Sequence, residues 1–461
     1  MSDIVAVSDH GEWLGHPKGL YTLVGTEVWE RFSFLGMQAL LMLYMTKYLL
    51  VPEQAAGVLG LAAFRGGVES VFGQLTDLGF AAQTYGIYSA ALYLTPVAGA
   101  WLGDRVLGQT RSVMIGCVVM ALGHLTMAIE NLFLIALTLL IVGAGFLLGN
   151  LTAKIGSLYS LDDQRRTRAF GIYLIAVNIG ALVAPLIVGT LGEKVGWHYG
   201  FGAAGIGMII GLSVFIYGRR YLPPDDIALR RERAVPVPRA ALTGSERRRI
   251  GVILLLLFAP YMLYGAAVFV SYSTMYIWAD SHVDRAMFGF EVPVTWIGIF
   301  DGIATIAGVW LGNRFSIWLA RRRGRDIGDI AKFGWGMAGV ALAWVFIAIT
   351  GAAALTPVVF WLIFYVIQDW SYAAFIEPQV QAVVSRDSPQ SIVAIMMSMI
   401  KMSAAASYIL AGWLGRFYEP LGAQNFFLLI AAVAGVAAVM LIVPFDWWVR
   451  RLGPAEAVME R

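Results

Sequence analysis

Three charged residues lie close together in the first long apolar segment of the chain. Glu27, Glu30 and Arg31 are spaced at i, i+3 and i+4 within the segment 20–47, so a helix places them on one face. A charge inside a membrane helix costs about 2.5–3.5 kcal/mol on insertion scales and usually marks a functional site. Arg31 can pair with Glu27 one turn earlier, which leaves one carboxylate in excess. Because burial favours the neutral form of a carboxyl group, we predict that the cluster takes up and releases a proton.

Further charges interrupt apolar segments in the second half of the chain. Lys401 lies within IVAIMMSMIKMSAAASYILAG, and Asp369 and Glu377 are about two turns apart in an earlier segment. We predict that Lys401 pairs with Asp369 or Glu377 and forms a gate. Both charged groups have a structural alternative. The first cluster could be an ion pair that only fixes its helix, and the side chains of Glu377, Lys401 and Lys154 could extend to the cytoplasmic interface.

The composition places these residues in a membrane protein. Of 461 residues, 59% are hydrophobic and 14% are charged, against about 25% charged in a soluble domain, and the mean hydropathy is +0.72. The net charge of +3 does not indicate nucleic-acid binding. The single Cys117 excludes an internal disulfide, and the five histidines have no metal-ligand spacing. No nucleotide-binding loop is present, so we expect neither an ATP-driven pump nor an enzyme with catalytic residues.

Twelve apolar segments are long enough to cross a bilayer, which needs about 20 residues per helix. Continuous apolar runs of this length predict helices, because barrel strands alternate over about ten residues. The fold class expected is therefore an all-α membrane protein with twelve transmembrane helices. The predicted spans are 20–47, 83–104, 111–130, 132–158, 169–191, 200–218, 250–276, 293–313, 333–351, 357–383, 391–415 and 424–444.

Basic residues predict the orientation of these helices. Lys and Arg concentrate in 162–168, 219–249 and 314–332, which all lie on one side if the N-terminus is cytoplasmic. Residues 1–18 lack the pattern of a cleavable secretory signal. We expect a multi-pass protein of the plasma or inner membrane with both termini in the cytoplasm.

The segment 219–249 also divides the chain, because it is polar, basic and contains proline. The sequence predicts an N-terminal six-helix bundle over 1–218, a basic cytoplasmic linker over 219–249 and a C-terminal six-helix bundle over 250–461. Two bundles around a site at the membrane midplane are typical of secondary carriers. Within the first bundle, 51–82 predicts a short amphipathic helix at the outer surface.

Several stretches resemble a known transporter family. PVAGAWLGDRVLGQTR (96–111) resembles the signature loop of the major facilitator superfamily. HPKGLYTLVGTEVWERFSFLGMQALLMLYM (16–45), with its Glu-x-x-Glu-Arg-Phe, is similar to the first helix of the proton-dependent oligopeptide transporters. FGIYLIAVNIGALVAPLIVGTLGE (170–193) is similar to the fifth helix of that family. The chain is thereby identified as an atypical member, which implies the major facilitator fold and proton-coupled symport of small peptides.

The resemblance also assigns roles to residues. It places Glu27, Glu30 and Arg31 in coupling and substrate binding, Tyr93 at a binding-site tyrosine, and Asn178 at an asparagine that holds the peptide. A lone membrane asparagine is otherwise more often a contact between helices. The residues expected at the substrate site, some of them replacements of family residues, are Tyr93, Asn178, Asp301, Gln38 and Phe34.

The departures from the family pattern concern charged residues. The fourth-helix lysine is replaced at Leu148, the tenth-helix glutamate at Ala373 and a first-helix arginine at Gln38, and 250–279 contains no Asp or Glu. Positive and negative groups are lost together, which avoids the cost of about 3–5 kcal/mol for leaving one buried charge without its partner. Asp301 stands where the eighth helix of the family has asparagine.

Three functions remain open on this basis. The first is proton-coupled symport of small peptides or peptide-like molecules, with the proton as coupling ion and no other cofactor. The second is a major facilitator carrier of a non-standard substrate with weak or altered coupling. The third is a non-transporting scaffold subunit of a membrane complex. The expected partners are membrane lipid and a small-molecule or peptide substrate, without nucleic acid, in a monomer or as a subunit of a complex.

Overall fold

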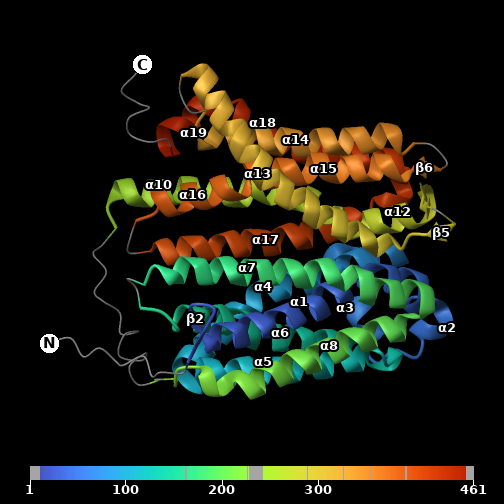
Figure 1. Cartoon of the computed structure of the whole chain (residues 1–461). Helices are drawn as coiled ribbons and strands as arrows, with labels where there is room; N and C mark the ends of the chain where they lie inside the picture. Colours follow the sequence, from blue (N-terminus) through green and yellow to red (C-terminus); the bar gives the residue numbers. More distant parts are fainter. Residues whose placement is uncertain are drawn as a thin grey trace. The chain divides into compact units, whose positions relative to one another are not determined.

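The computed structural model consists almost entirely of helices (Figure 1). It describes residues 11–160, 163–225, 227, 242–287, 289–324, 327–352, 355–389 and 392–452. Within these residues, ten helical stretches are long and apolar enough to cross a membrane. The predicted spans 20–47 and 83–104 are not among the ten. They form helices of 27 and 26 residues, and the first of these contains the charged cluster.

The internal contacts divide the chain into two units. The first comprises Met1–Phe64 and Leu94–Val237, and the second comprises Arg65–Tyr93 and Pro238–Arg461. The segment 65–93, which we predicted in the N-terminal bundle, therefore belongs by its contacts to the second unit. The predicted N-terminal bundle 1–218 includes this segment, whereas the first unit does not. Residues 226 and 228–241 of the predicted linker 219–249 lie outside the described residues.

The first unit is built around the helix that carries the charged cluster. Its helices are α1 (Lys18–Tyr44), α2 (Pro52–Ala55), the end of α4 (Asp77–Leu102), α5 (Gln109–Met127), α6 (Phe133–Gly156), α7 (Arg165–Ala184) and α8 (Trp197–Gly218). Strands β1 (Glu12–Trp13) and β2 (His16–Pro17) form an antiparallel hairpin before α1. α1 packs against α7 and α8, and α5 packs against α6. A Cβ atom on Gly180 of α7 would come within 2.6 Å of Arg31 Cβ, so glycine allows α7 to approach the cluster closely.

The second unit contains the remaining helices. These are α3 (Leu61–Phe72), most of α4, α10 (Gly244–Leu256), α11 (Met262–Val270), α12 (Thr274–His282), α13 (Ile297–Arg323), α14 (Asp329–Thr350), α15 (Val358–Phe375), α16 (Glu377–Asp387), α17 (Val393–Gly415), α18 (Tyr418–Ile442) and α19 (Phe445–Leu452). Strand β3 (Val283–Asp284) pairs in parallel with β6 (Thr356–Pro357), and β4 (Ala286–Met287) pairs with β5 (Phe290–Glu291). The predicted amphipathic helix in 51–82 corresponds to α3.

Two of the predicted spans are interrupted. The span 250–276 contains a π-helical segment, Leu257–Tyr261, and turns at 271–273 between α11 and α12. The span 357–383 breaks at Ile376, between α15 and α16. Pro378 follows this break at the start of α16, where its missing N–H group is tolerated. The prediction from hydropathy treated each span as one continuous helix and gave neither break, although Glu377 and Pro378 directly follow Ile376.

Two glycines of the 96–111 stretch make room for buried polar side chains. A Cβ atom on Gly103 would collide with Oδ1 of Asn150 on α6. Gly108 adopts a positive φ of 85°, and a Cβ atom there would lie 2.6 Å from Asp225 Oδ2. The two glycines of this stretch therefore allow the backbone to pack closely against the side chains of Asn150 and Asp225.

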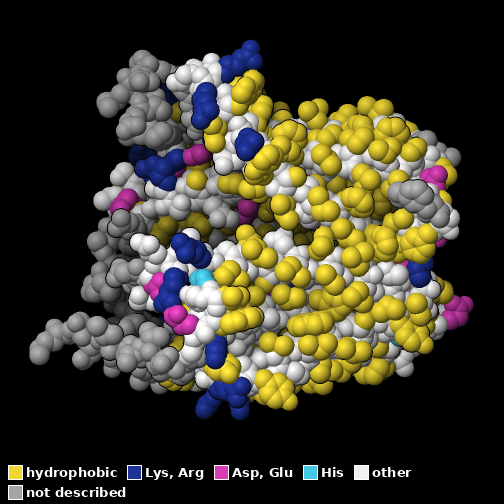
Figure 2. Space-filling model, viewed as in Figure 1, with side chains coloured by type: hydrophobic (Ala, Val, Ile, Leu, Met, Phe, Trp, Pro, Cys, Tyr) yellow, Lys and Arg dark blue, Asp and Glu magenta, His cyan; other side chains and the backbone are white. Residues whose placement is uncertain are grey.

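Charged side chains gather at the helix ends. In the second unit, the last turns of α13 and α19 carry Arg321–Arg323 and Arg450–Arg451. Figure 2 shows hydrophobic side chains along the sides of the helices, and Lys and Arg near the ends of α10, α13 and α19. This distribution is typical of helices that cross a bilayer and end at its interface.

Candidate functional site

The charged cluster of α1 is assembled as its spacing predicts. Arg31 Nε lies 3.1 Å from Glu27 Oε1 and 2.5 Å from Glu30 Oε2. The side chains of Glu27 and Glu30 are 1% and 0% exposed, and that of Arg31 is 16% exposed. The predicted ion pair between Arg31 and Glu27 is therefore present, and Arg31 contacts Glu30 as well.

Tyr173 on α7 completes this cluster, and the sequence analysis missed it. Its hydroxyl group donates a hydrogen bond of 2.9 Å to Glu27 Oε1 and lies 3.4 Å from Thr152 Oγ1 on α6. The only sign of this contact in the sequence was the presence of a tyrosine within the apolar stretch 170–193. The contact depends on how α7 is rotated against α1, which the sequence pattern does not give.

The charge balance of the cluster permits reversible protonation. One guanidinium group faces two carboxyl groups, and Glu27 Oε2 and Glu30 Oε1 are buried without a hydrogen-bond partner among the described residues. With both carboxyls ionised the cluster carries one excess negative charge, and one bound proton makes it neutral. Buried ionic groups are stable only when charges and hydrogen bonds are matched, so the two protonation states favour different surroundings.

Replacing Tyr173 by phenylalanine is expected to lower the free energy of unfolding by about 1.5–3 kcal/mol, the usual contribution of a hydrogen bond to a charged group. The substitution removes the donor to Glu27 and changes little else in volume. Thermal unfolding of the purified protein in detergent measures the effect. Tyr217→Phe on α8 is the matched control, because that side chain is 78% exposed. Equal melting temperatures for both variants would show that the bond contributes nothing.

The other predicted residues of the first unit lie at different distances from the cluster. The Phe34 ring is 5.2 Å from Arg31 Cζ, in a cation–π contact. Gln38 lies one turn further along α1 and is half-buried. Asn178 donates a hydrogen bond of 2.7 Å to Leu174 O of its own helix. Phe34 therefore contacts the cluster. The binding roles of Gln38 and Asn178 stay predictions.

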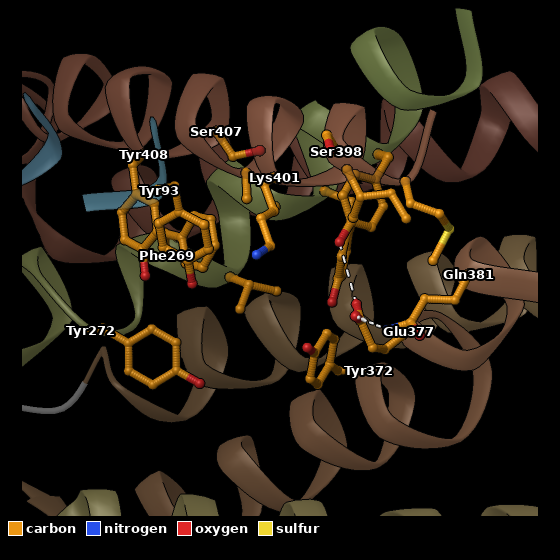
Figure 3. Close-up of a pocket in the computed structure, with 17 residues that line it drawn as sticks. Tyr93, Phe269, Tyr272, Tyr372, Glu377, Gln381, Ser398, Lys401, Ser407 and Tyr408 are labelled. Atoms are coloured by element: carbon orange, nitrogen blue, oxygen red, sulfur yellow. Dashed lines mark hydrogen bonds between the residues drawn. The ribbon is translucent and has the colours of Figure 1, made fainter. Parts of the chain in front are cut away.

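The second unit encloses a cavity of about 640 Å³. Figure 3 shows its wall, which is formed by side chains of α4, the segment 261–272, α15, α16 and α17. The aromatic residues of the wall are Tyr93, Tyr261, Tyr264, Phe269, Tyr272, Tyr372 and Tyr408. Phe269 and Tyr408 stack with ring centroids 3.6 Å apart, and Tyr93 lies 5.4 Å from Tyr408. Tyr93 is thus found at a cavity wall, as predicted for a binding-site tyrosine.

Two charged side chains project into this cavity from different helices. Figure 3 shows Lys401 of α17 with its ammonium group in the open space, and Glu377 of α16 on another part of the wall. Glu377 accepts hydrogen bonds from Tyr261 at 3.3 Å and from Gln381 at 2.7 Å. Lys401 forms no ion pair within the described part of the chain. The predicted pairing of Lys401 with Glu377 is therefore not seen, because tyrosine and glutamine hydroxyl and amide groups satisfy this carboxylate.

Asp369 does not pair with Lys401 either. Its carboxyl group lies within hydrogen-bonding reach of that of Asp301 on α13, which accepts a 2.9 Å hydrogen bond from Tyr272. Neither aspartate lines the cavity, although Tyr272 does. The predicted pairing of Asp369 with Lys401 is therefore not seen, and the substrate-binding role of Asp301 stays a prediction. Because α13 packs against α15, the carboxyl group of Asp369 faces Asp301 and not Lys401.

Lys154 does not extend to the interface, as one alternative proposed. Its side chain is fully buried at the end of α6, and its Nζ lies 2.7 Å from Asp225 Oδ1 and 2.6 Å from Pro223 O. Asp225 Oδ2 accepts a hydrogen bond from the N–H group of Thr110 at the start of α5. The pair thus holds the end of α6, the start of α5 and the segment after α8 together within the first unit.

Comparison with known proteins gives one consistent result. The chain matches the model of the POT family over residues 110–228 and 233–423. It is 40% identical over 211 residues to the uncharacterized transporter YclF of Bacillus subtilis, which is 45% of this chain and 39% of that protein. It is 37% identical over 260 residues to a di-/tripeptide transporter of Lactococcus lactis subsp. lactis, which is 55% of this chain and 48% of that protein. The matched part of the chain therefore spans less than half the length of either relative.

Solved structures of other proteins have the same fold as this chain over nearly its whole length. A peptide transporter POT in complex with sulfate is similar with a TM-score of 0.79 at 25% identity, covering 96% of this chain and 98% of that one. A POT family transporter in complex with 5-aminolevulinic acid has a TM-score of 0.76 at 22% identity and covers 95% and 98% of the two chains. The all-α membrane fold predicted from the sequence, that of the major facilitator superfamily, is thereby confirmed.

Proposed function

The chain belongs to the POT family, and from this premise we propose that it is a proton-coupled symporter of small peptides or peptide-like molecules. The observation that carries the proposal is the buried cluster of Glu27, Glu30 and Arg31 with Tyr173, which has one cation for two carboxyls. A cluster of this kind exists in two charge states that differ by one proton. A peptide as substrate is supported by the similarity to a di-/tripeptide transporter of Lactococcus lactis.

In the proposed mechanism, the proton is the coupling ion and no other cofactor takes part. A proton on Glu30 leaves Arg31 balanced by Glu27, whose second contact is the Tyr173 hydroxyl group. Loss of that proton gives Arg31 two carboxylate partners on α1 and changes the charge that the Tyr173 hydroxyl group of α7 faces. The charge state of the cluster thus selects between two arrangements of its helices, and binding of proton and substrate is linked through that equilibrium.

The cavity of the second unit contributes the substrate contacts in this proposal. Lys401 supplies a cation for a carboxylate, Glu377 supplies an anion for an amino group, and the tyrosines supply apolar faces with hydroxyl groups. These residues replace the charged groups that the family resemblance leads one to expect at other positions. The aromatic wall favours peptides or peptide-like molecules with large apolar side chains.

Replacing Lys401 by alanine is expected to raise the KM for a peptide about 10–150-fold, with a smaller change in kcat. The estimate corresponds to loss of a charge-assisted contact of about 1.5–3 kcal/mol. Initial rates of labelled dipeptide uptake into proteoliposomes give both constants, and Lys401→Arg should recover part of the affinity. Lys47→Ala, at an exposed position of the first unit, is the control. Unchanged transport and expression in Lys401→Ala would remove Lys401 from both the binding site and the predicted gate.

Uptake by the unmodified protein tests the proposed function itself. Proteoliposomes that contain the protein should accumulate labelled dipeptide when the outside is made acidic, and a protonophore should abolish the accumulation. No uptake at any pH would exclude peptide symport and would favour a carrier of another substrate. A stoichiometric partner protein in native membranes would favour the scaffold alternative.

The remaining proposals concern the placement of the protein in the cell. We propose that both termini lie in the cytoplasm, because basic residues concentrate in the same set of loops. The multi-pass character follows from ten apolar helices in the described residues and from the family. Location in the plasma or inner membrane, the monomeric state and the lack of enzymatic activity stay predictions.

A further inference from the structure

We propose that Asp301 and Asp369 form a second proton-binding site, in which the two carboxyl groups share one proton at a break in a membrane helix. The inference rests on the proposed function for its role in coupling, and on the geometry of the second unit for its existence. It concerns residues that the family resemblance does not assign to proton binding.

The two carboxyl groups are brought together by close packing of α13 on α15. A Cβ atom on Gly308 of α13 would lie 3.0 Å from Trp370 Cα and 3.3 Å from Asp369 O, so the glycine lets the two backbones approach. Asp301 lies about two turns before Gly308 on the same helix. The side chain of Asp369 is 2% exposed, and that of Asp301 is half-buried. Their carboxyl groups lie within hydrogen-bonding reach of each other.

A hydrogen bond between two carboxyl groups needs a proton, because ionised carboxylates only accept hydrogen bonds. Two like charges in contact in a buried site cannot both ionise, so such pairs hold a proton that a single exposed carboxyl would release. The groups that act on the pair in the described part of the chain are Tyr272 and Gln368. Both are neutral donors, so no cation substitutes for the shared proton.

Unsatisfied polar atoms around the pair point to a bound ligand. Asp369 Oδ2 and Gln368 Oε1 are buried and have no hydrogen-bond partner among the described residues. Gln368 is fully buried, and its Nε2 donates to Ser271 Oγ at 3.0 Å. A proton on Asp369 Oδ2, or its movement between the two carboxyls, would satisfy these acceptors without an added cation.

The break between α11 and α12 connects the pair to the cavity. Tyr365 on α15 donates a 2.7 Å hydrogen bond to Ser271 O at this break, and Gln368 binds the Ser271 side chain. Tyr272, in the same turn, lines the cavity and donates to Asp301 Oδ1 at 2.9 Å. Interrupted membrane helices form the ion sites of many carriers. Here the Tyr272 hydroxyl group offers a path for a proton between the cavity and Asp301.

Other titratable groups face the pair from each neighbouring element. Tyr264 of α11, Tyr272 of the break, and Tyr365 and Tyr372 of α15 lie within its electrostatic reach. On α13, Arg314 lies more than three turns away and stacks on Trp310. On α14, Asp329 is bound to Arg386. Lys401 of α17 projects into the cavity that Tyr272 also lines. With one shared proton the pair presents a single negative charge, rather than two, to all of these groups.

Infrared difference spectroscopy of the purified protein tests the site without any transport. On a Glu30→Gln background, which removes the carboxyl group that the proposed function protonates, we expect the carbonyl stretch of a protonated carboxyl group that shifts in D₂O. Asp301→Asn and Asp369→Asn should each shift this band, and the double variant should lose it. Glu419→Gln, at an exposed carboxyl, should leave it unchanged. A band that persists unshifted in the double variant would overturn the proposal.

Transport measurements then test the role in coupling. The reversal potential of uptake should show one proton fewer per substrate in the double variant than in the unmodified protein. Asparagine is the family residue at position 301, so Asp301→Asn is expected to fold. If the unmodified protein transports nothing, the proposed function fails while the infrared result still decides the proton site. Loss of the band on addition of Na⁺ would overturn the proposal, because it would assign the site to a metal cation.

Discussion

Glu30→Gln is expected to reduce proton-driven accumulation of peptide strongly while exchange of labelled for unlabelled peptide continues. The substitution keeps the size and the hydrogen-bonding capacity of the side chain, so Arg31 keeps a contact at this position. It removes the second carboxylate, and with it the charge state that a proton can neutralise. We expect accumulation to fall by about 5–150-fold, the usual range for coupling between two ligand sites. Counterflow and gradient-driven uptake in the same proteoliposomes separate the two effects.

A variant that lacks a surface carboxylate is the control for Glu30→Gln. Glu53→Gln removes one carboxylate from the exposed α2 and should leave both transport modes unchanged. Glu30→Gln with normal accumulation would show that the cluster is the structural ion pair of the alternative interpretation. Loss of exchange together with accumulation, in a protein that melts normally, would place Glu30 in substrate binding rather than in coupling.

The sequence could predict only those contacts of the site that form between residues close together on one helix. Glu27, Glu30 and Arg31 lie within one turn of one helix, so their spacing alone places them together. Tyr173 and Thr152 join them from α7 and α6, and those contacts depend on the rotation of each helix about its axis. A helix with apolar residues on all sides gives no preferred face, so its rotation cannot be inferred from its pattern.

The same reasoning explains why the ion pair predicted for Lys401 is not seen in the structure. Lys401, Asp369 and Glu377 were paired by their opposite charges, and no observation fixed which side of each helix they occupy. In the structure, Gly308 brings α13 against α15, and Asp369 meets Asp301 instead. Glycine-mediated approach of two helices is visible only once both partners are known. The breaks at 271–273 and at Ile376 escaped prediction because membrane helices tolerate interruptions that neighbouring helices satisfy.

Asp225→Asn is expected to destabilise the first unit more than any single substitution at its surface. Asp225 is 13% exposed, whereas the ammonium group of Lys154 that it contacts at 2.7 Å is fully buried. Removing one partner of a buried ion pair typically costs about 3–5 kcal/mol, because the other charge is left in an apolar region. Lys154→Met should cost less, since the remaining carboxylate reaches solvent. The double variant Lys154→Met/Asp225→Asn should recover most of the loss. Denaturant unfolding of the four proteins gives the coupling energy.

The pH dependence of unfolding tests whether the ionised carboxylate of Asp225 is the source of this stabilisation. Partial burial acts to raise the pKa of Asp225, but hydrogen bonds from Lys154 Nζ and Thr110 N–H outweigh it, and the pKa lies below its ordinary value. A carboxyl with a lowered pKa stabilises the folded protein above its unfolded pKa of about 3.9, and this contribution is lost as the pH falls through the folded pKa. The unmodified protein should therefore lose stability below about pH 4. The double variant should lack this component, and an identical acid profile for both would show that the pair does not contribute.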